Sequence, residues 1–427
     1  MPVAVNEMLN IKFAGGKFED FYVYDVTMKE AISDLYEADV LVLSDKAYTY
    51  EQLAEALFLN VTLSITQRLS KATQKRTRWF SGIVTAIEHL GVFYASDKKD
   101  CFSYRVHIEP PMAKLKYITR KAAYNRKTPI DVLSDIFAGQ ELSANFAEDF
   151  VSRRPFNSFG IYEQDEESDY DFLKRLTSMY GLSFSFKHLK AASNGLANTE
   201  LYFSTGERFP DWAEIAYSDG RSVPAVSQFD FRTENGDKNL WKLDSWSMNR
   251  KDGYDGVMLQ ETYPNSNVGS YDWKVGKTED KDKRRVYTSH FHGYARDVDK
   301  KSVDDDVALI LQAKYRSFQL DKDIWKGSGD NLLLTPCRMF SLTHFYGLKN
   351  DTAISTMITQ TQTHCRAKWP ATLAVAPDIN GNEEITEVSF SAMNYASSSG
   401  KRFCPKCVVL QRGECCGLAT MPLCSGM

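Results

Sequence analysis

The stretch QDEESDYDFLKRLTSMYGLSFSF, residues 164–186, joins an acidic run to an amphipathic pattern and then to an alternating apolar segment. Ser168 precedes Asp169 and Asp171, and an N-cap hydroxyl and the helix dipole both favour this order at the start of a helix. Gly181 is suited to the left-handed residue that ends many helices. We therefore expect a helix between Ser168 and Gly181, followed by a strand. Its expected buried face comprises Phe172, Leu173, Leu176, Met179 and Tyr180.

The same stretch contains an acidic cluster that raises the question of a metal site. Its members are Glu163, Asp165, Glu166, Glu167, Asp169 and Asp171. Carboxylate oxygens bind hard divalent cations, but the cluster lacks the alternating Asp/Asn spacing and central glycine of a calcium loop. Capping and the helix dipole already account for Asp169 and Asp171. We predict no metal site here, and we expect Glu163, Asp165 and Glu166 to carry surface or subunit-interface charge.

Upstream of this stretch, residues 25–109 have the alternation of strands. LNVTLSI (59–65) and FSYRVHIEP (102–110) each place three apolar residues on one face, and RWFSGIVTAIEHLGVFYA (78–95) is typical of a strand, a turn and a second strand. The expected inward residues are Val61, Leu63 and Ile65 in the first segment and Tyr104, Val106 and Ile108 in the second. These patterns predict a curled antiparallel unit.

Two further helices and a strand are expected. KTPIDVLSDIFAG (127–139) has Thr128 as a cap, Pro129 at the first helical position and Asp131 to close a capping box. Its apolar face comprises Val132, Leu133, Ile136 and Phe137. SVDDDVALILQAKYRSFQL (302–320) indicates an acid-capped helix, and GSGDNLLLTPCRMFSLTHF (327–345) a turn and a strand. KTEDKDKRR (277–285) is interpreted as a solvated loop.

Composition limits the classes of function. The 427 residues suggest about two to four compact units, and 43% hydrophobic, 25% charged and 13% aromatic residues are typical of a folded protein. A net charge of -4 with interspersed signs excludes the basic footprint of a nucleic-acid-binding protein. The N-terminus lacks the pattern of a signal peptide, and no apolar run approaches the ~20 residues that span a bilayer. We expect assembly in the cytoplasm without stable membrane insertion.

Histidines and cysteines provide the remaining candidate ligands. His290 and His292 share a face in a strand and can both reach a zinc ion, but no third ligand follows at a usual spacing. The tail contains Cys404, Cys407, Cys415, Cys416 and Cys424. CPKC resembles half of a zinc knuckle, whereas the adjacent Cys415 and Cys416 fit one tetrahedral site poorly, so the tail either binds zinc or lies outside the fold. Cys101, Cys337 and Cys365 are expected to be buried and reduced.

No recognised catalytic motif is present: GxSxG, HExxH, GxxxxGK[ST] and GxGxxG are all missing from the sequence. His89, His107, His188, His344 and His364 occur singly, without a partnered nucleophile motif. We therefore assign no catalytic, cofactor-binding or metal-binding residue, expect no cofactor, and do not expect an enzyme.

Several stretches together resemble the VgrG spike proteins of type VI secretion systems and the related baseplate hub proteins of contractile phage tails. ALFLNVTLSI, RWFSGIVTAIEHLG and YRVHIEPPMAKLKYITRKAAYNRKTPIDVLSDIF are similar to the opening barrel of that family, and residues 327–345 to a later strand, with Cys337 at a usual glycine position. The strongest match is in the opening stretch. Its matching residues are Gln164, Glu167, Ser168, Asp169, Phe172, Arg175, Leu176, Gly181, Phe184 and Phe186.

The resemblance covers about residues 20–395 and implies an α+β, mainly β fold like that of phage tail hubs. It would have two barrel-like antiparallel β domains, at residues 1–115 and 201–395, and a mixed helical insertion at 116–200. Residues 396–427 would form a Cys-rich tail outside the fold. Three chains would form a ring of six similar barrels, because a threefold spike can mate with a sixfold tube only if each subunit offers two similar surfaces.

The implied function is structural: a homotrimeric hub that joins a hexameric, Hcp-like inner tube and baseplate components to the trimeric puncturing spike, and is then secreted or injected with it. Family members continue into a long needle, whereas this sequence stops at Met427, so truncation, a frame shift or a needle supplied in trans are alternatives. A phage or prophage tail baseplate hub is the neighbouring function. A spike-borne cell-wall hydrolase is a third, for which the sequence contains no paired acid/base motif.

Overall fold

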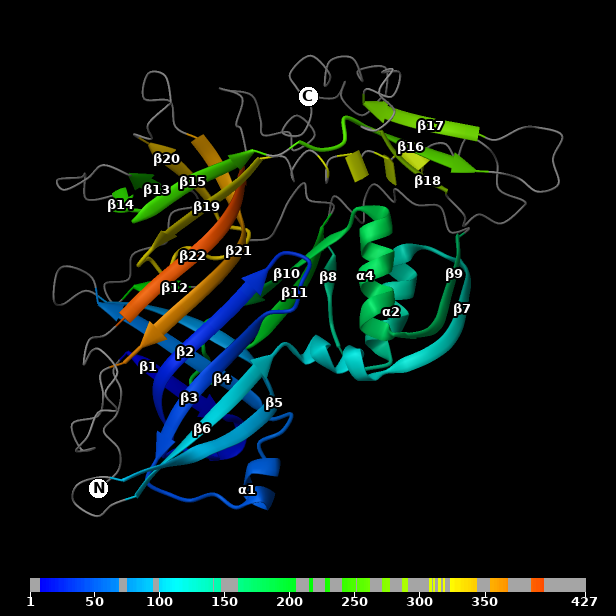
Figure 1. Cartoon of the computed structure of the whole chain (residues 1–427). Helices are drawn as coiled ribbons and strands as arrows, with labels where there is room; N and C mark the ends of the chain where they lie inside the picture. Colours follow the sequence, from blue (N-terminus) through cyan, green and yellow to red (C-terminus); the bar gives the residue numbers. More distant parts are fainter. Residues whose placement is uncertain are drawn as a thin grey trace.

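The computed structural model describes residues 8–68, 75–94, 100–140, 142–146 and 160–204, and shorter segments from there to residue 394. Those segments are residues 215–217, 227–230, 240–250, 252–261, 271–276, 286–290, 323–343, 354–367, 385–394 and parts of 307–318. Within them the chain is mainly antiparallel β with a few helices, which confirms the expected fold class (Figure 1).

The N-terminal strands form one antiparallel array in the order β1-β4-β5-β6-β3-β2. The expected inward faces are confirmed, because Val61, Leu63 and Ile65 of β4 and the three corresponding residues of β6 are all buried. A short helix, α1 (Tyr50–Ala54), precedes β4. The strands are β1 (Leu9–Phe13), β2 (Tyr22–Ala31), β3 (Glu37–Ser44), β4 (Asn60–Arg68), β5 (Lys75–Tyr94) and β6 (Asp100–Glu109).

The expected turn within residues 78–95 is wrong, because β5 is one continuous strand of 20 residues. Its register against β6 shifts at two places, between Val84 and Ala86 and between His89 and Gly91. Gly91 has a positive φ of 147° at the second shift. Bulges of this kind insert a residue and bend a strand without ending it, so β5 continues through both shifts.

The C-terminal strands extend the same sheet. β2 pairs antiparallel with β21, with Asp25 opposite Arg366 and Ala31 opposite Gln360 (Figure 1). Among the described residues the resulting sheet has 14 strands. The turn and strand expected in residues 327–345 are confirmed by the turns between β19 and β20 and by β20 itself. The added strands are β12 (Ile215–Tyr217), β13 (Ser227–Asp230), β14 (Leu240–Lys242), β15 (Ser245–Arg250), β19 (Asp323–Gly329), β20 (Met339–Thr343), β21 (Ile354–Arg366) and β22 (Ile385–Asn394).

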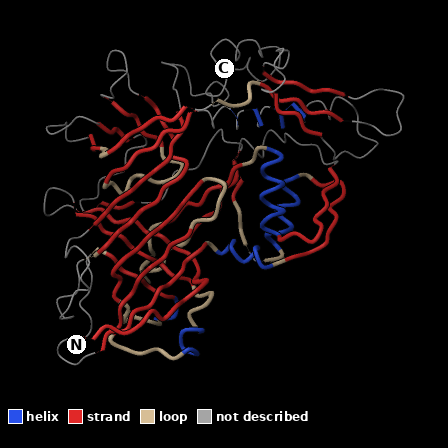
Figure 2. Tube along the Cα trace, viewed as in Figure 1, coloured by secondary structure: helices blue, strands red, loops and turns tan. Residues whose placement is uncertain are grey.

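Beside the sheet lies a helical region, residues 111–204. Helices α2 and α4 lie between a two-stranded ribbon, β7–β9, and a three-stranded sheet in the order β10-β11-β8 (Figure 2). The elements are η2 (Pro111–Tyr117), β7 (Thr119–Lys127), α2 (Pro129–Ala138), β8 (Asn145–Phe146), β9 (Gly160–Ser168), α4 (Asp169–Tyr180), β10 (Ser183–His188) and β11 (Thr199–Ser204).

Both helices begin as their sequences predict, and α4 also ends as predicted. Thr128 and Asp131 form the capping box of α2, while Ser168 accepts from the backbone of Asp171 in α4 and Gly181 ends α4 with a φ of 65°. The predicted apolar faces are buried, apart from Met179, which is half-buried. Local capping and helical periodicity therefore determine both elements.

The core of the helical region also includes residues from later in the chain. Val257 and Leu259 of β16 and Ile310, from the helical segment within 307–318, pack into the same cluster as Phe172 and Leu176. β16 (Gly256–Glu261) lies between β17 (Tyr271–Gly276) and β18 (Val286–His290). A separate core fills the N-terminal strands, and a smaller one the C-terminal strands.

Some predictions concern residues outside the described segments. These are the charged loop at 277–285, the start of the helix in 302–320, His292, and the tail at 396–427 with its five cysteines. The domain boundaries stay predictions. No helix in the described residues combines the length and apolar character that crossing a membrane requires.

Candidate functional site at the junction of the sheet and the helical region

A fully buried ion pair lies where the large sheet meets the helical region. Nη2 of Arg78, on β5, lies 2.6 Å from Oε1 and 2.5 Å from Oε2 of Glu30, on β2. The two side chains are 1% and 7% exposed. Burial alone would raise the pKa of Glu30, but Arg78, with His188 nearby, lowers it to about 2. The carboxylate is therefore ionised at neutral pH, and it is paired as a buried charge must be.

His188 lies against this pair from the helical region. Its ring stacks on Phe80 of β5 at a centroid distance of 4.6 Å and meets the edge of Tyr36 at 4.7 Å. Nε2 lies 3.5 Å from Oε1 of Glu30, and Nδ1 lies 3.2 Å from the backbone N of Ser81. β10 is thus held on β5 by aromatic and polar contacts together.

Hydroxyl groups complete this cluster. The Tyr36 hydroxyl donates to the carbonyl of Ser81 at 2.6 Å, and Thr199 of β11 donates to the same carbonyl at 3.1 Å. Thr361 of β21 lies 3.5 Å from Oε2 of Glu30. We call this set the junction: Glu30, Tyr36, Arg78, Ser81, His188, Thr199 and Thr361. It links both halves of the large sheet to the helical region.

The turn between β2 and β3 reaches into the helical region next to the junction. The backbone N of Ile32 donates to the carbonyl of Thr359 at 2.9 Å, and that of Ser33 donates to Phe184 at 2.8 Å. Ser33 has a positive φ of 61°. A non-glycine residue with this backbone is uncommon, and here hydrogen bonds on both sides of the turn hold it in place.

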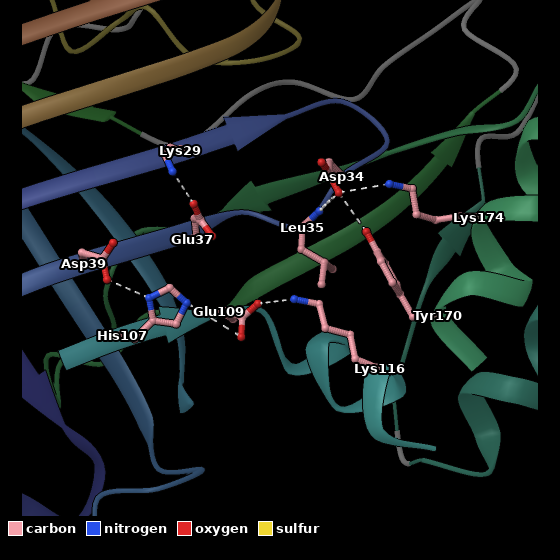
Figure 3. A network of polar contacts seen from close by, with 10 residues as sticks. All are labelled: Lys29, Asp34, Leu35, Glu37, Asp39, His107, Glu109, Lys116, Tyr170 and Lys174. Atoms are coloured by element: carbon pink, nitrogen blue, oxygen red, sulfur yellow. Dashed lines mark hydrogen bonds and ion pairs between the residues drawn. The ribbon is translucent and has the colours of Figure 1, made fainter. Parts of the chain in front are cut away.

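Asp34, at the tip of this turn, connects to α4 (Figure 3). Its Oδ1 accepts from the Tyr170 hydroxyl at 2.9 Å and lies 3.3 Å from Nζ of Lys174. Burial and the hydrogen bond to Asp34 raise the pKa of Tyr170, so the hydroxyl stays a donor. The start of α4 is thereby tied to the sheet.

A second series of polar contacts crosses from β3 to η2 in the same view (Figure 3). Nδ1 of His107 lies 2.9 Å from Asp39, its Nε2 lies 3.9 Å from Glu109, and Lys116 of η2 lies 2.6 Å from Glu109. The Asp39 side chain is 48% exposed, so its pairing stabilises the fold only weakly. Glu109 is the buried member of the series.

The acidic cluster of the opening stretch is dispersed by the fold. Asp169 is buried and pairs with Arg120, and it also accepts from Nε2 of Gln164 at 2.9 Å. Glu167 pairs with Arg175 of α4. The backbone carbonyl of Glu163 accepts from Arg175 at 2.6 Å. Asp169 is therefore an anchor of the helix as well as a partner of its dipole.

The remaining acids of the stretch have different surroundings. Asp165 pairs with Lys121 at 2.8 Å, and both side chains are well exposed. Glu163 and Glu166 are exposed, and Glu166 has a positive φ of 55° at a register shift of the β7–β9 ribbon. Asp171 caps α4 with Ser168. Among the described residues no three or more His, Cys, Asp or Glu side chains are arranged to hold a metal ion.

The other candidate ligands are spread over the fold. The backbone of His290 lies in β18, opposite Gln260 of β16. Cys101, Cys337 and Cys365 are free and buried, as expected. Burial raises the pKa of both Cys337 and Cys365 to about 12, so neither thiol is reactive at neutral pH.

Sequence analysis did not identify the junction. The sequence nevertheless contains an indication of the junction. Glu30 follows Val26 and Met28 on the inward face of β2, and Arg78 precedes Phe80 on the inward face of β5. A charge at an inward position of an alternating strand requires a buried partner. His188 is a fully buried polar residue at the end of β10.

The sequence profile of the phage tail baseplate hub matches residues 29–369, which include the whole junction. The chain belongs to the phage tail baseplate hub family. No curated protein sequence matches this hub protein. The match confirms the expected resemblance to hub-type proteins.

Two solved structures share the fold of this hub protein. One is the E. coli c3393 protein, a component of the type VI secretion system with structural similarity to the T4 bacteriophage tail proteins gp27 and gp5. It has a TM-score of 0.54 and 15% identity, over 91% of this chain and 77% of that one. The other, the tail protein from Neisseria meningitidis MC58, has a TM-score of 0.54 and 9% identity, over 94% of this chain and 98% of that one.

Proposed function

We propose that this protein is the structural hub of a contractile injection machine, at the base of a type VI secretion spike, where it joins a hexameric, Hcp-like inner tube to a trimeric puncturing spike. The observation that carries the proposal is the baseplate hub match over residues 29–369. The fold shared with a type VI secretion component over 91% of the chain supports it.

In this proposal three copies form the hub. A threefold assembly can seat on a sixfold tube ring if each chain offers two similar β surfaces, and closed cyclic symmetry limits the assembly to three copies. Baseplate components and a spike needle or tip supplied by another chain are the further partners. The hub would assemble in the cytoplasm and leave the cell with the spike.

The junction suits such a function. A hub transmits force between a tube and a spike, so its subdomains need fixed relative positions. The buried Glu30–Arg78 pair and the Asp34–Tyr170 hydrogen bond tie the sheet to the helical region at separate places. A buried ion pair and a separate hydrogen bond at the boundary between these two regions restrict how the regions can be arranged, which is the property the proposal requires.

A second candidate is a baseplate hub in a phage or prophage tail. The description of the matching family and the tail protein from Neisseria meningitidis MC58, 98% of which is covered, favour it. The fold and the hub role would be the same in both machines. Neighbouring genes for a sheath and an unfolding ATPase support the secretion spike, whereas genes for a portal and a tail tube support the virion.

We infer that the hub is not an enzyme. The charged groups of the junction are buried and paired with one another, which leaves them no access to a substrate. A spike-borne cell-wall hydrolase is the alternative, and it predicts soluble fragments when the purified protein is incubated with peptidoglycan. Release above that of a heat-unfolded control would overturn the non-enzymatic assignment.

The joining role is tested by mixing the purified hub with the tube protein encoded in the same gene cluster and imaging the product by electron cryomicroscopy. The proposal predicts three hub copies on one end of each six-membered ring. A tube protein from an unrelated cluster is the control for non-specific stacking. A folded, trimeric hub that leaves its own tube rings uncapped would contradict the proposal.

A further inference from the structure

The protonation state of His188 follows from the geometry of the junction. Nδ1 lies 3.2 Å from the backbone N of Ser81, which can only donate, so Nδ1 must accept. The neutral ring then has its proton on Nε2, which lies 3.5 Å from Oε1 of Glu30 without forming a hydrogen bond to it. The closed junction therefore holds one tautomer of a neutral histidine.

A second proton on the ring is unfavourable in this arrangement. It would reside on Nδ1, opposite the backbone N–H of Ser81, and two donors would face each other. The Thr199 hydroxyl, 3.1 Å from the same nitrogen, donates to the Ser81 carbonyl and lies 2.7 Å from Oγ of Ser81, so its oxygen is shared among these groups and is a poor acceptor for a proton on Nδ1. The ring also has no room to turn away, because Phe80 and Tyr36 contact it on separate sides.

The charges around the ring act in opposite directions. Glu30 of β2 favours the protonated ring, Arg78 of β5 opposes it, and the neutral Tyr36 hydroxyl contributes no charge. Thr199 of β11 is not titratable. Burial is the largest influence, and with Arg78 it outweighs Glu30, so the pKa of His188 lies below its ordinary value. Glu30 already has its charge matched by Arg78.

We propose that His188 is a pH-sensitive latch that holds β10 and β11 on β5 while its ring is neutral and releases them when it is protonated. The open junction exposes the ring to water, where it takes up a proton near its ordinary pKa of about 6.5. Acidification below this pH stabilises the open state alone. The latch concerns the internal movement of the chain and does not rest on the hub function.

The direction and size of the change in the opening equilibrium with pH follow from the linkage between proton binding and opening. Because the closed state resists the proton, its stability relative to the open state is constant well above pH 6.5 and falls as the pH drops through that value. One such group raises the opening equilibrium constant about tenfold between pH 7.5 and pH 5.5.

The test is hydrogen exchange of the full chain at these two pH values, with rates corrected for intrinsic exchange. Protection of residues 183–188 and 199–204 is expected to fall about tenfold at pH 5.5, while that of β19 and β22, which contain no histidine, stays unchanged. Equal loss in all strands, or no loss in β10 and β11, would overturn the latch.

Two variants make the test specific. In His188→Asn the side-chain oxygen takes the place of Nδ1 and accepts from Ser81 but does not titrate, so protection should become independent of pH. His89→Asn removes an exposed histidine of β5 and should retain the tenfold change. If His188→Asn does not fold, the NMR titration of His188 in the native protein decides: a folded-state pKa of 6.5 or above would overturn the latch.

Discussion

Helices α2 and α4 begin with the same capping pattern but differ in the parts of the chain to which they are attached. Each has a hydroxyl cap and an aspartate at the third helical position: Thr128 with Asp131 in α2, and Ser168 with Asp171 in α4. At the first helical position α2 has Pro129, whereas α4 has Asp169, which is buried and paired with Arg120. The residue at the first helical position therefore distinguishes the two helices: α2 is only capped, whereas Asp169 also attaches α4 to Arg120 of β7.

The anchoring of α4 continues on its next turns. Tyr170 and Lys174 bind Asp34 at the tip of the β2–β3 turn, so α4 connects the helical region to the sheet. In α2, by contrast, Asp135 pairs with Lys127, which lies in the strand just before the helix. The difference shows that an aspartate caps a helix where it is exposed and attaches the helix to another part of the chain where it is buried.

The largest effect is expected where the two helices are alike, on their buried faces. Phe172→Asp in α4 and Val132→Asp in α2 each place a carboxylate in the shared core without a partner, and each should lower the free energy of unfolding by more than about 4 kcal/mol. Loss of the helical circular dichroism signal and rapid proteolysis would be the readouts. The exposed Ser178→Asp is the control, and unchanged melting of Phe172→Asp would contradict the helix packing.

The next effect separates the helices. Asp169→Ala removes the buried acceptor of Arg120, which is itself 33% exposed, and of Gln164, and should lower the free energy of unfolding by about 2–3 kcal/mol. Asp131→Ala in α2 removes only an exposed capping group, for which about 1 kcal/mol is expected. A double-mutant cycle with Arg120→Ala, followed by denaturant unfolding, measures the pair. Equal effects of the two aspartates would remove the distinction between capping and anchoring.

The caps should again behave alike. Ser168→Ala and Thr128→Ala each remove an acceptor for a backbone N–H of the first turn, and each should cost about 1 kcal/mol. Ser168→Thr and Thr128→Ser keep the hydroxyl and serve as matched controls. A loss in Ser168→Ala as large as in Asp169→Ala would mean that the anchor acts through the cap.

The smallest loss of stability is expected for Lys174, the exposed partner of Asp34 on α4. Lys174→Ala removes an ion pair to Asp34 in which both side chains are about half exposed, so the expected loss is below about 1 kcal/mol and disappears in high salt. Tyr170→Phe removes the more buried hydrogen bond and should cost more. Thermal melting at low and high salt compares the two, and a larger, salt-insensitive loss for Lys174→Ala would reverse their assigned roles.

These contrasts also show which parts of the structure the sequence can predict. Caps and apolar faces involve residues within one or two turns of each other, and the starts and apolar faces of α2 and α4, with the end of α4, were predicted correctly. The Asp169–Arg120 and Arg78–Glu30 pairs join residues 49 and 48 positions apart, and His188 meets Ser81 across 107. No local pattern encodes such distances.

The prediction of a turn within residues 78–95, which form part of β5, was wrong for a related reason. The two register shifts of β5 depend on how β6 lies beside it, which residues 78–95 alone do not determine. The family resemblance predicted the hub fold because its motifs were compared with a known arrangement. The inward charges Glu30 and Arg78 were the local sign of the junction, since alternation places both on the buried face of their strands.

The hub assignment predicts that this chain forms trimers in solution. Sedimentation velocity of the full chain over a wide range of concentrations at neutral pH should show a species of three times the chain mass that grows with concentration. Folding is confirmed on the same samples by circular dichroism. A folded protein that sediments as a monomer, or as a dimer, at every concentration would contradict the account.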